Sequence, residues 1–286
     1  MNEIIISENL VRQLITDQFP TWQNLQIKEV EKSGHDNRTF RLGDTMCVRL
    51  PSALSYASQV EKEFEWLPKL APHISLSITE PLALGTPNTD YPYSWSINKY
   101  LEGETLQLSD NNKSDVAKEL ANFLKELESI DATNGPLAGT HNFYRGGQLS
   151  VYHYEVVDAL EKLKAVLDVD SCCSIWEIAL SSKWNKEDVW VHGDIAIGNL
   201  LHKNYHLTGV IDFGILGVGD PACDLVMAWT YFDDSSRKIF MQEMNLDSST
   251  WDRARGWALW KALITYDNET SKNVVEILIS EYKSIR

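Results

Sequence analysis

The stretch from Val189 to Asp224 constrains the fold of this chain more than any other feature of its sequence. Two short runs of apolar, β-forming residues in it each lead into a polar residue, Asp194 after the first run and Asp212 after the second. Asn199 lies between them, just before a predicted hairpin that turns through residues 203–204 and holds Asn199 beside Asp212. The pattern therefore predicts two strands that deliver three polar side chains into loops at one edge of a sheet.

These three side chains suit phosphoryl transfer from a nucleotide, which depends on positioned groups and metal ions. Asp194 is the candidate catalytic residue that accepts or orients the proton of an attacking hydroxyl group. Asn199 and Asp212 are the candidate metal ligands, because Mg²⁺ takes a few hard oxygen ligands and keeps several waters. Asp and Asn after strands also serve as turn formers or helix caps. Three of them at the spacing H-G-D-x-x-x-x-N, followed by D-F-G, favour the kinase interpretation.

The same stretch resembles the aminoglycoside phosphotransferase family, the small-molecule branch of the protein-kinase-like fold. The matching residues are His192-Gly193-Asp194, Asn199, Asp212-Phe213-Gly214, Gly219-Asp220-Pro221 and Asp224. The resemblance implies an α+β, bilobal protein-kinase-like fold with a small β-rich N-lobe and a larger, mainly helical C-lobe. It places a nucleotide-binding lobe at residues 1–102 and a catalytic, acceptor-binding lobe at residues 103–286. It also implies Mg²⁺ as cofactor and ATP or GTP as phosphoryl donor.

The resemblance assigns further nucleotide-binding residues to the N-lobe. Ser33 and Gly34 lie between two predicted strands, where a loop would cover the phosphates, although an ordinary turn explains this single glycine equally well. Arg49 stands where the family usually has a phosphate-binding lysine, and arginine binds phosphate bidentately. Glu63 is the candidate brace for Arg49, with a solvated glutamate as the alternative. The backbone from Lys99 to Leu101 would bond the edge of the purine.

Helical periodicity predicts most of the remaining elements. In the helix predicted at residues 57–70, we expect one buried face, made of Val60, Phe64, Leu67 and Leu70. Residues 151–181 read as one helical stretch that shapes the acceptor pocket. The aromatic residues between positions 251 and 266 are expected in the core, with a pocket wall as the alternative.

Three residues near the central motif are expected to support it without doing chemistry. Asp224 is expected to hold the catalytic loop by hydrogen bonds, and Asp220 to cap or turn the chain. His192 is expected to be a structural hydrogen-bond donor, and not a carrier of protons.

The composition limits the partners. A net charge of −15 argues against nucleic acid and anionic membrane surfaces, and it permits a cationic small-molecule acceptor. We find no apolar run of membrane-spanning length and no signal-peptide pattern at Met1-Asn2-Glu3. The four cysteines fit no zinc spacing and read as reduced thiols of a cytoplasmic protein. A monomer is expected, with a dimer left open.

Three functions compete for this sequence. The first is a kinase of a small hydroxylated molecule, foremost an aminoglycoside, with macrolide, choline, homoserine and sugar-amine acceptors as alternatives. The second is a protein kinase, which the sequence disfavours because residues 215–219 leave no room for a peptide-docking segment. The third is a non-catalytic nucleotide-binding protein, against which the complete set of Asp194, Asn199 and Asp212 argues.

Overall fold

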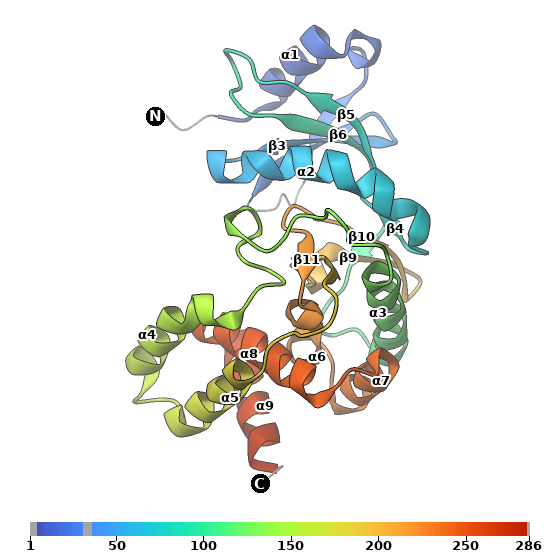
Figure 1. The fold of residues 1–286 in the computed structure, drawn as a ribbon. Helices are drawn as coiled ribbons and strands as arrows, with labels where there is room; N and C mark the ends of the chain where they lie inside the picture. Colours follow the sequence, from blue (N-terminus) through green and yellow to red (C-terminus); the bar gives the residue numbers. More distant parts are fainter. Residues whose placement is uncertain (1–4, 31–35, 285–286) are drawn as a thin grey trace. The chain divides into compact units, whose positions relative to one another are not determined.

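The computed structural model describes residues 5–30 and 36–284. The chain divides into two compact units (Figure 1). The N-terminal unit comprises Met1–Gly103 together with Gly209–Gly214, and the C-terminal unit comprises Glu104–Thr208 and Ile215–Arg286. The division that we predicted from the sequence did not anticipate that the short segment carrying Asp212 belongs with the N-terminal unit.

The N-terminal unit is built around a five-stranded sheet with the order β1-β2-β3-β6-β5, in which all neighbours are antiparallel. Its elements are α1 (Glu8–Gln18), β1 (Ile27–Glu29), β2 (Asn37–Leu42), β3 (Met46–Pro51), α2 (Leu54–Leu70), β4 (Ser77–Ile78), β5 (Pro81–Gly85) and β6 (Trp95–Lys99). Strand β4 pairs in parallel with Gly209 and Val210. The sequence predicted α1 with its Ser7 cap, and the Ser7 side chain accepts a hydrogen bond from the Leu10 N–H group.

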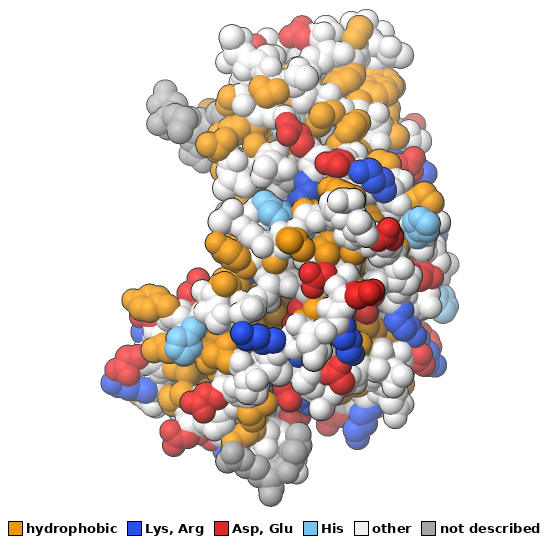
Figure 2. Space-filling model, in the orientation of Figure 1, with side chains coloured by type: hydrophobic (Ala, Val, Ile, Leu, Met, Phe, Trp, Pro, Cys, Tyr) orange, Lys and Arg blue, Asp and Glu red, His pale blue; other side chains and the backbone are white. Residues whose placement is uncertain are grey.

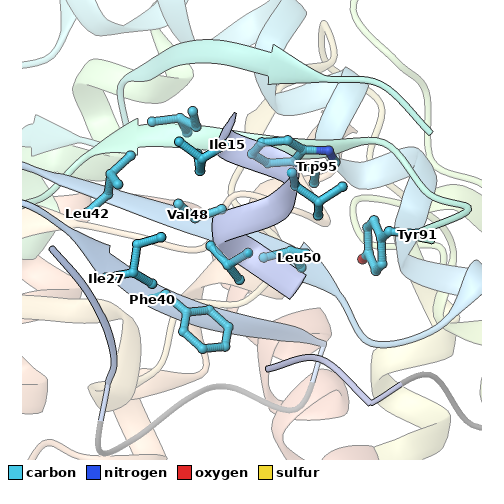
Figure 3. Close-up of a cluster of buried hydrophobic side chains, with 11 residues drawn as sticks. Ile15, Ile27, Phe40, Leu42, Val48, Leu50, Tyr91 and Trp95 are labelled. Carbon is cyan, nitrogen blue, oxygen red and sulfur yellow. The ribbon is translucent and has the colours of Figure 1, made fainter. Parts of the chain in front are cut away.

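Helices α1 and α2 lie on opposite sides of this sheet (Figure 1). Because side chains alternate along a strand, Val48 and Leu50 of β3 point into a core that α1 covers (Figure 3), while Arg49 points to the other face. There Arg49 meets Glu63 of α2. The alternation of β3 therefore places one charged residue beneath α2.

The predicted buried face of α2 was wrong at one position. Phe64 is 37% exposed, and Glu63 takes the inward position with 4% exposure, in line with Val60 and Leu67. The physical reason is charge pairing, because the sheet offers Arg49 beneath this turn of the helix.

The C-terminal unit is mainly helical. Its strands and longer helices are β7 (Glu104–Thr105), α3 (Lys113–Glu128), α4 (His153–Leu163), α5 (Val169–Ser181), β8 (Val189–Val191), β9 (Leu200–Lys203), β10 (His206–Val210), β11 (Gly217–Gly219), α6 (Met227–Thr230), α7 (Asp234–Met244), α8 (Ser248–Ile264) and α9 (Glu269–Ser284). Strand β8 pairs antiparallel with β11, and β9 pairs antiparallel with β7. The predicted hairpin is formed by β9 and β10, but its left-handed turn residues are Asn204 and Tyr205, one position later than predicted.

The helical stretch predicted at residues 151–181 is two helices. Helix α4 ends at Leu163, and α5 begins after Asp168, whose side chain accepts a hydrogen bond from the Ser171 N–H group. An aspartate at that N-cap starts a new helix, which periodicity of apolar residues alone does not reveal.

On the face shown in Figure 2, Asp and Glu side chains lie among Lys and Arg side chains instead of forming one acidic patch. Within the part of the chain that is described, no helix combines the length and the apolar character needed to cross a membrane.

Candidate active site

Arg49 joins two carboxylates in the N-terminal unit. Its Nη1 lies 3.1 Å from both carboxylate oxygens of Glu63, and its Nη2 lies 2.7 Å from Oδ1 of Asp212. The side chains of Arg49 and Glu63 are 13% and 6% exposed, whereas Asp212 is 36% exposed. The structure thus brings together the predicted phosphate-binding arginine, its predicted brace and one predicted metal ligand.

The electrostatics of this triad keep the arginine charged. Burial opposes the charge, but Glu63 and Asp212 outweigh burial, so the pKa of Arg49 lies above its ordinary value. Burial raises the pKa of Glu63, and the neighbouring Arg49 opposes that shift. Nη1 of Arg49 contacts both carboxylate oxygens of Glu63 and Nη2 contacts Asp212, so the two ion pairs together hold the guanidinium group in place.

Asp212 is held in an unusual backbone conformation. Its φ angle is +69°, a left-handed value that residues other than glycine adopt rarely. The following Phe213 is fully buried, and a Cβ atom on Gly214 would lie 2.5 Å from Oε1 of Gln59 in α2. Packing on both sides of this turn therefore imposes the strained conformation, which is typical of functional positions.

The predicted catalytic loop lies in the C-terminal unit, directly after β8. Asp224 accepts hydrogen bonds from the N–H groups of His192 and Gly193, at 2.6 and 2.7 Å. Burial raises the pKa of Asp224, while His192 and these two N–H groups act in the opposite direction. The expected supporting role of Asp224 is confirmed. Nδ1 of His192 accepts a hydrogen bond from the Asp194 N–H group, so His192 also supports this loop.

Asn199 is oriented by Asp194. Its Nδ2 donates to the backbone oxygen of Asp194 at 2.9 Å and to Oδ2 of the same residue at 3.0 Å. Both bonds use the nitrogen end of the amide, so Oδ1 is the atom left for another ligand. The Asp194 side chain itself is exposed.

The donor set fits magnesium. Asn199 offers the amide oxygen Oδ1, and Asp212 offers Oδ2, because its ion pair with Arg49 uses Oδ1. Two hard oxygens with remaining positions for water and phosphate suit Mg²⁺. Among the described residues, no group of three or more His, Cys, Asp or Glu side chains has a metal-binding arrangement. Since Asn199 and Asp212 belong to different units, their predicted proximity stays a prediction.

Two other predicted nucleotide contacts have different outcomes. The N–H group of Lys99 donates to the Glu80 carbonyl oxygen, so this N–H group is not available to a purine. The N–H group of Leu101 makes no hydrogen bond to any residue that the structure describes, and it is available to an acceptor. Ser33 and Gly34 lie outside the described residues.

The sequence reasoning missed Arg145, whose Nε donates to the Gly193 carbonyl oxygen at 3.0 Å. The prediction that the aromatic residues of α8 lie in the core is confirmed for its tryptophans. Trp257 and Trp260 are buried, with 2% and 5% exposure, and both face the Arg145 guanidinium group. Because Arg145 lies within a predicted loop, no periodicity or motif in the sequence indicates these contacts.

Residues 27–257 match the sequence profile described as the phosphotransferase enzyme family. The chain belongs to this family. It is 25% identical to an aminoglycoside 3′-phosphotransferase of Escherichia coli over 169 residues, which span 54% of this chain and 60% of that relative.

Solved structures of the family have the same fold. The GDP complex of aminoglycoside 2′-phosphotransferase-IIIa superposes with a TM-score of 0.72 at 17% identity, covering 98% of this chain and 99% of that one. A macrolide 2′-phosphotransferase from Brachybacterium faecium superposes with a TM-score of 0.63 at 16% identity, covering 95% and 98% of the two chains. The predicted α+β, protein-kinase-like fold of this chain is confirmed.

Proposed function

We propose that this phosphotransferase moves the γ-phosphoryl group of ATP or GTP to a hydroxyl group of a small molecule, foremost an aminoglycoside. The observation that carries the proposal is the pair of hydrogen bonds from Asn199 to Asp194. These bonds orient Asp194 as the base, and they leave the amide oxygen of Asn199 available for a metal ion. The relative from Escherichia coli named above supports the aminoglycoside acceptor. A cytoplasmic monomer is part of the proposal.

The residues of the candidate active site divide the work of this reaction between the proton, the metal ion and the nucleotide. Asp194 accepts the proton of the acceptor hydroxyl group, and Asn199 holds Asp194 in place. Asp212 and Asn199 are the ligands for Mg²⁺, which when bound neutralises charge that develops on the transferred phosphoryl group. Arg49, braced by Glu63, contacts the nucleotide phosphates. Ser33, Gly34, the Lys99 carbonyl group and the Leu101 N–H group complete nucleotide binding.

A macrolide is the second candidate acceptor, because a macrolide 2′-phosphotransferase shares the fold over 95% of this chain. The acidic composition favours a cationic acceptor, and amino sugars give both classes a positive charge. Choline, homoserine and sugar-amines remain alternatives of the same reaction type, since fold does not fix the substrate. A non-catalytic nucleotide-binding protein is the alternative of a different kind.

The decisive experiment is nucleotide turnover, measured as coupled release of ADP or GDP in the presence of magnesium. The acceptor panel contains aminoglycosides, macrolides, choline and homoserine. We expect an aminoglycoside to stimulate turnover, and the phosphorylated product to be seen by mass spectrometry. Stimulation by a macrolide alone moves the assignment to the second candidate. Nucleotide binding without any stimulated turnover removes the aminoglycoside and macrolide assignments, and it leaves an acceptor outside the panel, such as a sugar-amine, or the non-catalytic alternative.

Substitution of Arg49 tests the nucleotide-binding role. Arg49→Met is expected to lower kcat/KM for nucleotide by about 10²-fold, the usual effect of losing one charge-stabilising donor. Arg49→Lys keeps a positive charge but lacks the two-nitrogen fork of the guanidinium group, and it is expected to show most of the same loss. Steady-state kinetics with varied nucleotide measure both effects, and Arg12→Met on the exposed side of α1 is the matched control. Equal kinetics of all three variants and the wild type would remove Arg49 from the site.

A further inference from the structure

The loop before α4 has a strained backbone. Phe143 and Tyr144 have φ angles of +48° and +54°, and Gly146 follows at +79°. Large aromatic residues avoid left-handed backbone conformations, so their surroundings must impose this geometry. The residue presented between them and the glycine is Arg145.

Buried contacts hold this loop against β11. Asn142, which is fully buried, accepts a hydrogen bond from the Gly139 N–H group and donates one to the Arg145 carbonyl oxygen at 2.9 Å. The Gly146 carbonyl oxygen accepts from the Asp220 N–H group at 2.8 Å. Glycine is required at position 219, because a Cβ atom there would lie 2.1 Å from that same carbonyl oxygen. The loop is therefore fixed at both ends of Arg145.

The Arg145 side chain is held as firmly as its backbone. Its guanidinium carbon lies 5.1 Å from the ring centre of Trp257 and 4.9 Å from that of Trp260, within the range of cation–π attraction. Its Nη1 donates to the hydroxyl group of Tyr152 at 3.2 Å, and Tyr152 stacks on Trp260. These contacts aim the Nε–H group at the Gly193 carbonyl oxygen, 3.0 Å away.

This contact and one other fix the peptide bond that leads into Asp194. Arg145 binds its carbonyl oxygen, and Nδ1 of His192 binds its N–H group at 3.1 Å. A planar peptide bonded at both edges cannot rotate, so the direction of the Asp194 side chain is set. From these contacts we infer that Arg145 is a positioning residue for the base Asp194. The catalytic consequence rests on the proposed function.

Kinetics of two variants test this inference. Arg145→Met removes the donor, and we expect kcat to fall by about 10²-fold, the effect of a small misplacement of a catalytic group. The KM for nucleotide is expected to stay within about twofold, because Arg145 does not act on nucleotide binding. Arg145→Lys keeps charge and the aromatic contacts, and it is expected to recover part of the activity.

Arg255→Met is the matched control. Its guanidinium carbon also lies over a tryptophan, 5.5 Å from the ring centre of Trp229, and it pairs with Asp252 and Glu281. It has no contact with the catalytic loop among the described residues, so kcat is expected to stay at the wild-type value. A fall in kcat equal to that of Arg145→Met, or a lower melting temperature with unchanged kcat in the Arg145 variants, overturns the inference.

Hydrogen exchange separates this inference from the proposed function. We expect the Asp194 amide to exchange at least about tenfold faster in Arg145→Met than in Arg255→Met, because loss of the bond to the carbonyl oxygen lets the peptide open locally. If the Asp194 amide exchanges at the same rate in both variants, Arg145 is not a positioning residue, whatever the kinetics of the variants show. If the wild-type protein turns over no acceptor, the proposed function fails, while the exchange result still decides the role of Arg145.

Discussion

Asp194→Asn is expected to lower kcat by about 10³-fold, within the range for loss of a general base. Asparagine has the same shape, so the backbone oxygen of residue 194 still accepts from Asn199 and the loop keeps its hydrogen bonds to Asp224. The substituted amide cannot take the proton of an attacking hydroxyl group. Nucleotide affinity, measured by calorimetry, is therefore expected to change by less than about threefold, since the loss falls on a transition-state interaction.

Asp17→Asn is the matched control for this prediction. Asp17 lies exposed on α1 of the N-terminal unit, and its substitution makes the same change of charge on the surface. We expect wild-type kcat for this control. If Asp194→Asn kept a tenth or more of the wild-type kcat, Asp194 would not be the base, and the reaction would need no proton acceptor at this position.

The candidate catalytic loop could be recognised in the sequence because its motif is local. The apolar run of β8 predicts a strand that ends just before the loop. The spacing from Asp194 to Asn199 is short enough for one loop to bring these two side chains together. Asp224 was predictable as a support because the loop needs acceptors for its N–H groups, and Asp224 provides them. For Asp194, Asn199 and Asp224, the residue type and its position in the motif were enough to predict the contacts that each side chain makes.

Phe64 and Arg145 show where this reasoning ends. An alternative with Phe64 on the buried face of α2 fits helical periodicity equally well, and only the position of Arg49 on the sheet decides between them. Arg145 lies 48 residues from its partner Gly193 and depends on left-handed residues that have no turn signal. Pairings of this kind follow from tertiary packing, which overrides local preference.

A buried ion pair in the C-terminal unit combines stability with support of the site. Arg253 of α8 donates from Nε and Nη2 to the two carboxylate oxygens of Asp220, at 2.6 and 3.2 Å, and the side chains are 5% and 7% exposed. Asp220 also caps the short helix that carries Asp224, by accepting from the Ala222 N–H group. The Arg253–Asp220 ion pair therefore lies about one helical turn from Asp224, which holds the candidate catalytic loop.

Arg253→Met is expected to lower the free energy of unfolding of the C-terminal unit by about 3–5 kcal/mol, because it leaves the Asp220 carboxylate buried without its counter-charge. For a unit of this size, that corresponds to a melting temperature lower by about 10 °C, measured by scanning calorimetry. Arg255→Met is the matched control, since its partners are partly exposed, and we expect a loss within about 1 kcal/mol.

The double variant Asp220→Asn/Arg253→Met separates the cost of an unpaired charge from the value of the pair itself. With neither charge present, nothing remains to be neutralised, so we expect the double variant to unfold at a higher temperature than Arg253→Met alone. Strict additivity of the single losses would mean that each residue acts through its other contacts, such as those of Arg253 with Ser182 and Ser249. The kcat of the folded double variant then shows what the pair does for the reaction. If kcat falls although the protein is folded, the pair sets the position of Asp224, and through it the catalytic loop.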